Sequence, residues 1–208
     1  MHVVLLALLL GTIACDRNHA EGHGGGSSAP RDDTAREQAR FDRERNPKKV
    51  VEALKIGPGS RVADIGAGSG LLTIHLARAV APNGRVVATD IDGQVLDLLH
   101  QRLAAVGLAD IVERRVVGPD TPQLEAGLYD AILLAEVDNY MADRVGWLRA
   151  ATLALKPTGR IVISNRIHRR TESMDAARKA GLLLESESTP VPTHFIAVFV
   201  PASPEKKP

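Results

Sequence analysis

A glycine-rich turn between a buried strand and a helix is the feature of this sequence that most constrains its fold. Residues 61–65 read as a short apolar strand, and residues 71–77 begin a helix with apolar residues on one face. Between them, Gly66, Gly68 and Gly70 let the backbone turn sharply and let a ligand approach where a Cβ atom would clash. The free N–H groups at the start of the helix then point into the crevice beside the turn. This arrangement predicts a site for a nucleotide-like cofactor.

The spacing of these glycines distinguishes between cofactors. A dinucleotide-binding turn has the pattern G-x-G-x-x-G, and its third glycine packs the helix against the strand. Here that third position is Leu71, and the pattern is instead G-x-G-x-G, preceded by Asp64 inside the strand. Leu71 therefore argues against a nicotinamide oxidoreductase.

The segment from Asp64 to Gly70 resembles motif I of the class I S-adenosylmethionine-dependent methyltransferases. The amino-acid tail of S-adenosylmethionine carries an ammonium and a carboxylate, which suit an acid near the strand end and bare backbone. The resemblance implies that the cofactor is S-adenosylmethionine and that it contacts Asp64, Gly66, Ala67, Gly68 and Gly70.

A second acid supports the same cofactor. Residues 85–90 form an apolar run that ends in Asp90, about twenty residues after the glycine turn, where an acid accepts the ribose hydroxyls of an adenosine. Capping of the next helix is an alternative role for Asp90, although Asp92 is better placed as that cap and both roles can hold. In the resembling family the residue after this acid lies against the adenine, which makes Ile91 an apolar wall for the base.

The remaining motifs of the family follow in order. Residues 111–117 are a candidate third strand, and after them comes Asp120, where the family has an acid that reaches the adenine amino group. Residues 128–135 resemble the fourth strand, and the resemblance makes Ala135, at its end, a cofactor contact. Residues 153–164 resemble a helix that ends at Lys156 and Pro157, a turn and a fifth strand.

Strands alternate with helical stretches along the chain, which predicts an α/β fold with a doubly wound, mostly parallel sheet. Near the end, residues 182–189 and 194–200 are strand-like runs joined by a proline-containing link, and they predict a C-terminal antiparallel hairpin. A sheet of about seven strands with such a final antiparallel strand is typical of the Rossmann-like methyltransferase fold.

The loop after the predicted fourth strand is the expected place for the methyl acceptor. We expect Glu136, Asn139 and Tyr140 to face the substrate. Helix capping or loop polarity explains such residues equally well, so no catalytic base and no metal ligand is assigned. The formal net charge is +1 and aromatic residues make up only 3% of the chain, which argues against a nucleic-acid partner and for a small-molecule acceptor.

Two functions fit these motifs. One is methyl transfer by in-line displacement on the sulfonium of S-adenosylmethionine, which requires mostly alignment from the protein. The other is binding of an S-adenosyl ligand by a catalytically inactive, membrane-tethered protein. The oligomeric state is not predicted.

The N-terminal segment raises a separate question. Residues 3–10 form an apolar run that is short for a membrane span but suits the core of a signal peptide. Cys15, the only cysteine, follows a small residue, which resembles a bacterial lipoprotein box. The segment departs from that box at Thr12, where leucine is usual, and in lacking a lysine or arginine before the core. A buried helix and an uncleaved anchor are the alternatives.

These features divide the chain into four parts. We expect a signal or lipobox-like segment over residues 1–15, a disordered tether over residues 16–40, a methyltransferase domain over residues 41–201 and a disordered tail over residues 202–208. The predicted localisation is that of a membrane-anchored lipoprotein, with a cytoplasmic protein as the alternative. Because S-adenosylmethionine is made in the cytosol, an exported domain would lack a supply of this cofactor.

Overall fold

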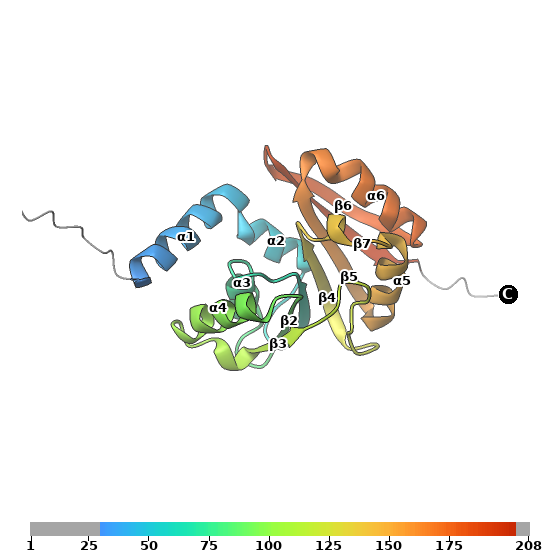
Figure 1. Ribbon diagram of the computed structural model, residues 1–208. Helices are drawn as coiled ribbons and strands as arrows, with labels where there is room; N and C mark the ends of the chain where they lie inside the picture. Colours follow the sequence, from blue (N-terminus) through green and yellow to red (C-terminus); the bar gives the residue numbers. More distant parts are fainter. Residues whose placement is uncertain (1–29, 203–208) are drawn as a thin grey trace, which may run out of the picture.

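A single sheet of seven strands, ordered β3-β2-β1-β4-β5-β7-β6, organises the computed structural model, which describes residues 30–202 (Figure 1). The neighbouring strands from β3 to β5 pair in parallel, and β7 pairs antiparallel with both β5 and β6. The strands are β1 (Arg61–Ile65), β2 (Arg85–Asp90), β3 (Val112–Val116), β4 (Tyr129–Ala135), β5 (Leu155–Arg166), β6 (Leu182–Val191) and β7 (His194–Pro201). The predicted doubly wound sheet with a C-terminal hairpin is therefore confirmed.

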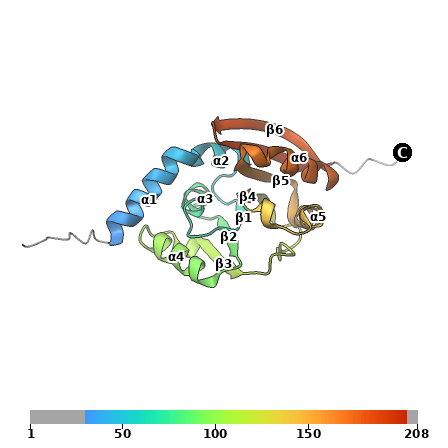
Figure 2. The same ribbon diagram turned by 45° about the horizontal axis from the view of Figure 1, so that its top comes forward.

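Helices cover both faces of this sheet. Figure 2 shows α3 and α4 on one side and α5 and α6 on the other. The helices are α1 (Pro30–Arg45), α2 (Pro47–Leu54), α3 (Thr73–Val80), α4 (Gly93–Ala104), α5 (Arg144–Ala154) and α6 (Arg170–Lys179), with short 3-10 helices η1 (Ala109–Ile111), η2 (Asp138–Tyr140) and η3 (Ile167–Arg169). Within the described residues, no helix combines the length and the apolar character that crossing a membrane requires.

The strands alternate between two apolar cores, because successive side chains of a strand point to opposite faces. Val62 packs with α2, α3 and α4 in one core, whereas the next residue, Ala63, packs with α5 and α6 in the other. On β4, Ile132, Leu133 and Leu134 are all fully buried, so both faces of this strand are covered. A continuous apolar run is the expected pattern for such a central parallel strand.

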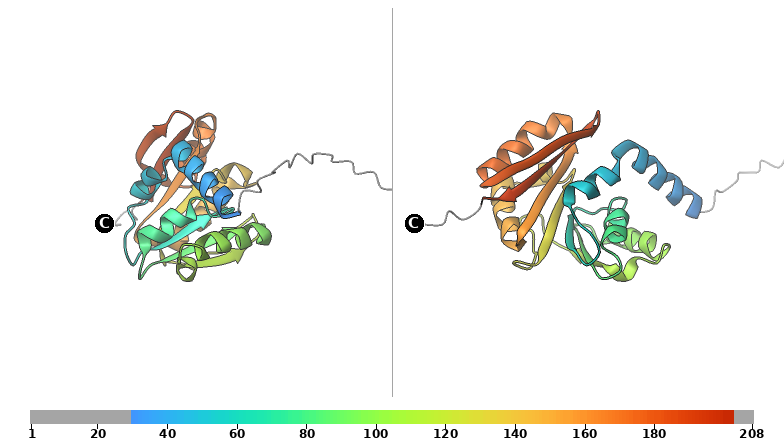
Figure 3. Two further views of the ribbon diagram at one scale, coloured as in Figure 1. Left: turned by 90° about the vertical axis from the view of Figure 1, so that its left-hand side faces the viewer. Right: turned by 180° about the vertical axis from the view of Figure 1, so that it is seen from behind.

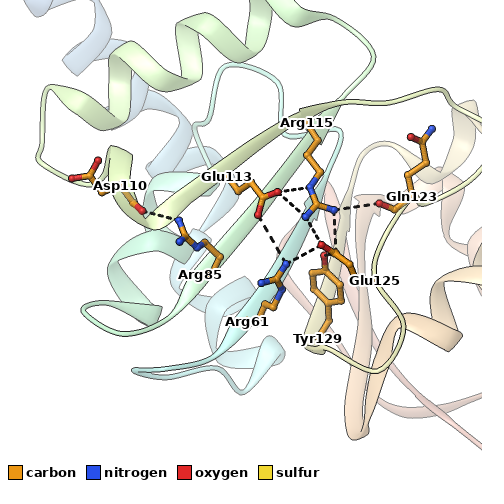
Figure 4. Close-up of polar contacts among 8 residues, drawn as sticks. All are labelled: Arg61, Arg85, Asp110, Glu113, Arg115, Gln123, Glu125 and Tyr129. Atoms are coloured by element: carbon orange, nitrogen blue, oxygen red, sulfur yellow. Dashed lines mark hydrogen bonds and ion pairs between the residues drawn. The ribbon is translucent and has the colours of Figure 1, made fainter.

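The connection between β3 and β4 has no helix, and charged side chains cover the sheet beside it (Figure 4). Arg115 forms ion pairs with Glu113 at 2.7 Å and with Glu125 at 2.6 Å. Arg61 pairs with Glu125 at 3.3 Å, and its guanidinium lies 5.2 Å from the centre of the Tyr129 ring. The hydrogen bonds that Glu125 accepts from Arg115 and Tyr129 hold the pKa of this carboxyl down to about 2.

The predicted disordered tether over residues 16–40 differs from the structure at its end. Residues 30–40 are helical in α1 and belong to the domain. Alanine, arginine, glutamine and glutamate, all strong helix formers, dominate this stretch, and Arg40 pairs with Glu44 one turn later at 2.9 Å. The glycines and serines that favour a tether lie at residues 22–28, before this helix begins. The predicted lipobox over residues 1–15, the rest of the tether and the tail from residue 203 lie outside the described residues.

Two element boundaries also differ from the sequence prediction. The helix before β5 ends at Ala154 and not at Lys156, because Leu155 already pairs with Tyr129 of β4. Strand β6 continues through Pro190 to Val191, further than the predicted end at residue 189. A proline is tolerated there because β6 is the edge of the sheet, where a missing N–H costs no ladder hydrogen bond.

Candidate functional site

The glycine turn after β1 has three residues in the left-handed region, Gly66 at φ 66°, Gly68 at φ 54° and Gly70 at φ 85°. A Cβ atom at Gly66 would lie 2.7 Å from Val137, and one at Gly70 would lie 2.7 Å from Leu99. At Gly68 a Cβ atom would meet no atom within 4 Å. A side chain at either of the outer two glycines would therefore clash with the protein, whereas one at Gly68 would meet open space.

Asp90, at the end of β2, faces this turn. Its carboxylate accepts hydrogen bonds from the backbone N–H of Gly68 at 2.9 Å and from that of Asp92 at 3.1 Å. Asp92 is the N-cap of α4, because its carboxylate accepts from the N–H of Gln94 at 2.8 Å. Capping is thus carried out by Asp92, and Asp90 stays beside the glycine turn, as the sequence predicted.

A cavity of about 280 Å³ opens beside Asp90, at the carboxyl ends of β1, β2 and β4. Strand order reverses between β1 and β4, and a ligand crevice is expected at such a switch point. Six of the residues predicted for the site line the cavity, namely Gly66, Asp90, Ile91, Ala135, Glu136 and Tyr140. The rest of the wall is mostly apolar, as is usual for a small-molecule site.

Asp64 lies beneath the glycine turn and does not line the cavity. Its side chain is 2% exposed and accepts a hydrogen bond from the hydroxyl of Thr73 at 2.7 Å, which joins β1 to the first residue of α3. Burial raises the pKa of Asp64 to about 7, against the effect of the Thr73 donor and assisted by the charge of Asp90. The Asp64 carboxyl therefore links β1 to α3 from below the turn, and its predicted contact with the cofactor stays a prediction.

Four more predicted residues lie away from the cavity wall. Ala67, Gly68 and Gly70 belong to the turn but do not line the cavity itself. Asp120 is exposed in the turn that follows β3, and the next two residues, Thr121 and Pro122, line the cavity instead.

The loop after β4 divides into two structural roles. Asn139 accepts a hydrogen bond from the side-chain amide of Asn165 at 3.0 Å and does not line the cavity, contrary to prediction. Asp138 is fully buried and accepts from Asn165 and from the hydroxyl of Ser173, each at 2.6 Å. These contacts fix η2 to β5 and α6, and the residues of this loop that line the cavity are Glu136, Val137, Tyr140 and Met141.

Glu136 is surrounded by donors from three distant elements. Arg45, at the end of α1, donates to one carboxylate oxygen, to which the Nε2 of His194 also lies at 3.0 Å. Arg166, at the end of β5, donates to the other oxygen at 3.1 Å. Burial opposes ionisation of Glu136, but the charge of Arg45 and the other two donors outweigh it and hold its pKa below the ordinary value.

The sequence did not reveal the partners of Glu136. No local pattern singles out Arg45, Arg166 or His194. They meet Glu136 only because α1, the end of β5 and the start of β7 converge at the end of β4.

Helix α1 extends outward from α2 (Figure 3), and side-chain contacts also join it to the cofactor turn. Arg102 of α4 donates to the carbonyl of Ser69 at 2.9 Å and pairs with Glu37 of α1 at 2.6 Å. Gln38 of α1 donates to the carbonyl of Leu71 at 2.9 Å. Because these contacts join α1 to the backbone of the turn, the position of α1 and the shape of the turn depend on one another.

Comparison with known proteins finds methyltransferases. A family model described as a methyltransferase domain matches residues 63–161. Residues 63–161 are therefore similar to methyltransferase domains, and the predicted resemblance to S-adenosylmethionine-dependent methyltransferases is confirmed over this segment. The ubiquinone/menaquinone biosynthesis C-methyltransferase UbiE of Ectopseudomonas mendocina is 30% identical over 114 residues, which cover 55% of this chain and 44% of that protein. The chain spans about half the length of the curated relatives it matches.

Solved structures share the fold. A methyltransferase from Aquifex aeolicus superposes with a TM-score of 0.72 at 18% identity, covering 81% of this chain and 96% of that chain. The geranyl diphosphate C-methyltransferase of Streptomyces coelicolor A3(2), solved with Mg²⁺, geranyl diphosphate and S-adenosyl-L-homocysteine, gives a TM-score of 0.66 at 16% identity and covers 86% of each chain.

The geometry of the site fits the cofactor of this family. Open space beside Gly68 leaves room for a ligand against the backbone, and Asp90 offers carboxylate oxygens next to it. Ile91, whose exposed fraction is 68%, presents an apolar side chain at the cavity. An adenosine needs these three features, which are room at the turn, an acceptor for ribose hydroxyls and an apolar wall for its base.

Proposed function

We propose that this protein transfers a methyl group from S-adenosylmethionine to a small-molecule acceptor. The observation that carries the proposal is the carboxylate of Asp90, which lines a largely apolar cavity and accepts from the backbone N–H of Gly68, where a side chain would meet open space. The cofactor, when bound, supplies a methyl group already activated on a sulfonium, so the protein has mainly to align the acceptor with it. Two solved relatives of the same fold bind geranyl diphosphate, which supports a small acceptor.

The residues of this chain divide the work of such a reaction. Asp90 holds the ribose hydroxyls, and the turn around Gly68 admits the amino-acid part of the ligand. Ile91 and the other apolar residues of the cavity keep water from the base. Glu136 and Tyr140 lie on the same cavity wall and face the acceptor.

Calorimetry on the protein with S-adenosylhomocysteine, S-adenosylmethionine and NAD tests the cofactor assignment. We expect both S-adenosyl ligands to bind and NAD not to bind. Gly68→Val should abolish this binding while the domain remains folded. The matched control is Gly107→Val, because Gly107 also has a positive φ of 71° and open space around it but is remote from the cavity. Binding of NAD alone, or an unchanged affinity of the Gly68 variant, would refute the assignment.

We further propose membrane attachment through Cys15, on the strength of the lipobox-like sequence alone. The full-length protein should then fractionate with membranes, and Cys15→Ser should release part of it or leave the precursor uncleaved. A lipid contributes about 0.8 kcal/mol per buried methylene, and firm attachment takes more than one chain or a second membrane-binding signal. Recovery of the native protein entirely in the soluble fraction, with residues 1–15 intact by mass spectrometry, would contradict attachment.

A further inference from the structure

Four ionisable side chains beside the cavity have no role in holding the cofactor. We call Arg45, Glu136, Arg166 and His194 the Glu136 cluster. In this cluster the guanidiniums of Arg45 and Arg166 face the carboxylate of Glu136. The cluster lies at the ends of β4 and β5 and the start of β7, where His194 also contacts Glu136. Glu136 is the member that also lines the cavity, so the cluster borders the space available to an acceptor.

The histidine of the cluster is a hydrogen-bond donor and not a base. A carboxylate only accepts, so the Nε2 of His194, 3.0 Å from Glu136, carries the proton of the ring. The Nδ1 atom then accepts from the hydroxyl of Thr193 at 2.8 Å. Burial and the charge of Arg45 lower the pKa of His194, which favours its neutral form. Both ring nitrogens are occupied, and His194 positions Glu136.

The carboxylate of the cluster is also a poor base. Three donors stabilise its ionised form, and the pKa of Glu136 is lowered as a result. General-base catalysis near neutral pH is most efficient with a pKa close to that pH. The cluster thus suits an acceptor that arrives already ionised and needs no base.

The two guanidiniums leave positive charge in excess of the single carboxylate. Arg45 is largely buried, with 15% of its side chain exposed, and its Nε atom has no hydrogen-bond partner among the described residues. Arg166 is open to solvent, with 61% of its side chain exposed. A buried donor without a partner is costly, and a guanidinium binds a carboxylate or similar oxyanion through two parallel hydrogen bonds.

We propose that the methyl acceptor is an organic anion with an apolar body, and that Arg45 and Arg166 bind its anionic oxygens. The inference rests on the proposed methyl transfer and assigns the substrate class of that same site. The apolar body would lie against Val137, Tyr140 and Met141, which line the adjoining cavity. Specificity would follow from charge, because a neutral analogue leaves the excess positive charge unpaired.

The test uses benzoate and benzamide as probes, since they share a shape and differ in charge. Each is titrated into the full-length protein saturated with S-adenosylhomocysteine, and binding is followed by calorimetry and by the NMR signals of the arginine Nε–H groups. We expect benzoate to bind at least about tenfold more tightly than benzamide, the scale of a charge-assisted hydrogen bond. The Nε–H signal of Arg45 should shift with benzoate alone.

Variants separate this proposal from the assignment of the cofactor. Arg166→Gln should lose the preference for benzoate while S-adenosylhomocysteine binds as before, and Arg45→Gln should lose the same preference. Glu136→Gln should tighten benzoate binding, because it removes the competing carboxylate, whereas a merely structural glutamate would give no gain. Arg78→Gln, at an exposed position on α3, is the matched control.

Each contrary outcome has a distinct meaning. Equal binding of the two probes, binding of neither, or an unchanged preference in Arg166→Gln would overturn the anionic acceptor. Since Arg166 is exposed, its variant keeps the test valid even if Arg45→Gln loosens α1. Failure of the wild-type protein to bind S-adenosylhomocysteine would instead overturn the proposed function.

Discussion

Replacement of the buried carboxyl beneath the glycine turn should make the stability of the domain less dependent on pH. Asp64 has an ordinary pKa near 3.8 when unfolded and about 7 in the folded protein, because burial disfavours its charge. Between these values the folded state holds more protons than the unfolded state. Stability is therefore full below about pH 4 and falls as the pH rises towards about 7.

The magnitude follows from the width of that window. A difference of roughly three pKa units corresponds to about 4 kcal/mol, at 1.36 kcal/mol per unit. Asp64→Asn has the same shape, does not titrate, and keeps an oxygen to accept from Thr73. The free energy of unfolding of this variant, relative to wild type, should thus rise by on the order of 4 kcal/mol between about pH 4 and pH 8.

Urea unfolding across this pH range measures the effect. Trp147, the only tryptophan, is 3% exposed in the core beside α5, so its fluorescence reports unfolding. Asp175→Asn on α6 is the control, since half of that side chain is exposed. Parallel stability curves for wild type and Asp64→Asn would refute the reasoning, because Asp64 would then titrate alike in both states.

Three further changes test other parts of the structure. Gly70→Ala should lower the free energy of unfolding, measured in urea, by about 2–3 kcal/mol. The new Cβ atom would lie 2.7 Å from Leu99, and residue 70 has a positive φ that alanine disfavours. A loss smaller than the measurement error would contradict this. Asp90→Ala should weaken S-adenosylhomocysteine binding by on the order of 1–3 kcal/mol in calorimetry, and an unchanged affinity would remove Asp90 from the site. The ion pair of Glu125 with Arg115 lowers the pKa of Glu125, so it stabilises the fold above about pH 4.5 and this stabilisation is lost as the pH falls towards about 2. Arg115→Gln should therefore lose less free energy of unfolding than wild type during acid titration. An equal loss would rule out a stabilising ion pair between Glu125 and Arg115.

Local patterns in the sequence were sufficient for the sheet and the cofactor turn. The first two strands were predicted with their observed bounds, and Asp90 was expected to face the glycine turn while Asp92 caps α4. Each of these features depends on residues close together in the chain, whose periodicity, backbone freedom and capping act over one or two turns. Features of this kind can therefore be predicted without knowing which distant part of the chain packs against them.

Tertiary packing decided which of the predicted site residues contact other parts of the protein, which these local patterns leave open. The sequence predicts Gly66 and Gly70 as ligand contacts, and the structure shows that a Cβ atom at these positions would also clash with Val137 and Leu99. Asp64 was expected at the cavity, yet the start of α3 covers it through Thr73. A glycine or an acid has the same sequence signature whether its neighbour is a ligand or another part of the protein, so only the fold tells the two apart.

The Glu136 cluster is where tertiary structure adds most. Glu136 could be singled out from its place after β4, whereas its partners Arg45, Arg166 and His194 stand 91, 30 and 58 residues away. Hydrogen bonds between such distant residues depend on strand order and on the docking of α1, which no local pattern encodes. The sequence alone therefore determined the strands, the cofactor turn and the family, and the tertiary structure alone decided which charges surround the acceptor.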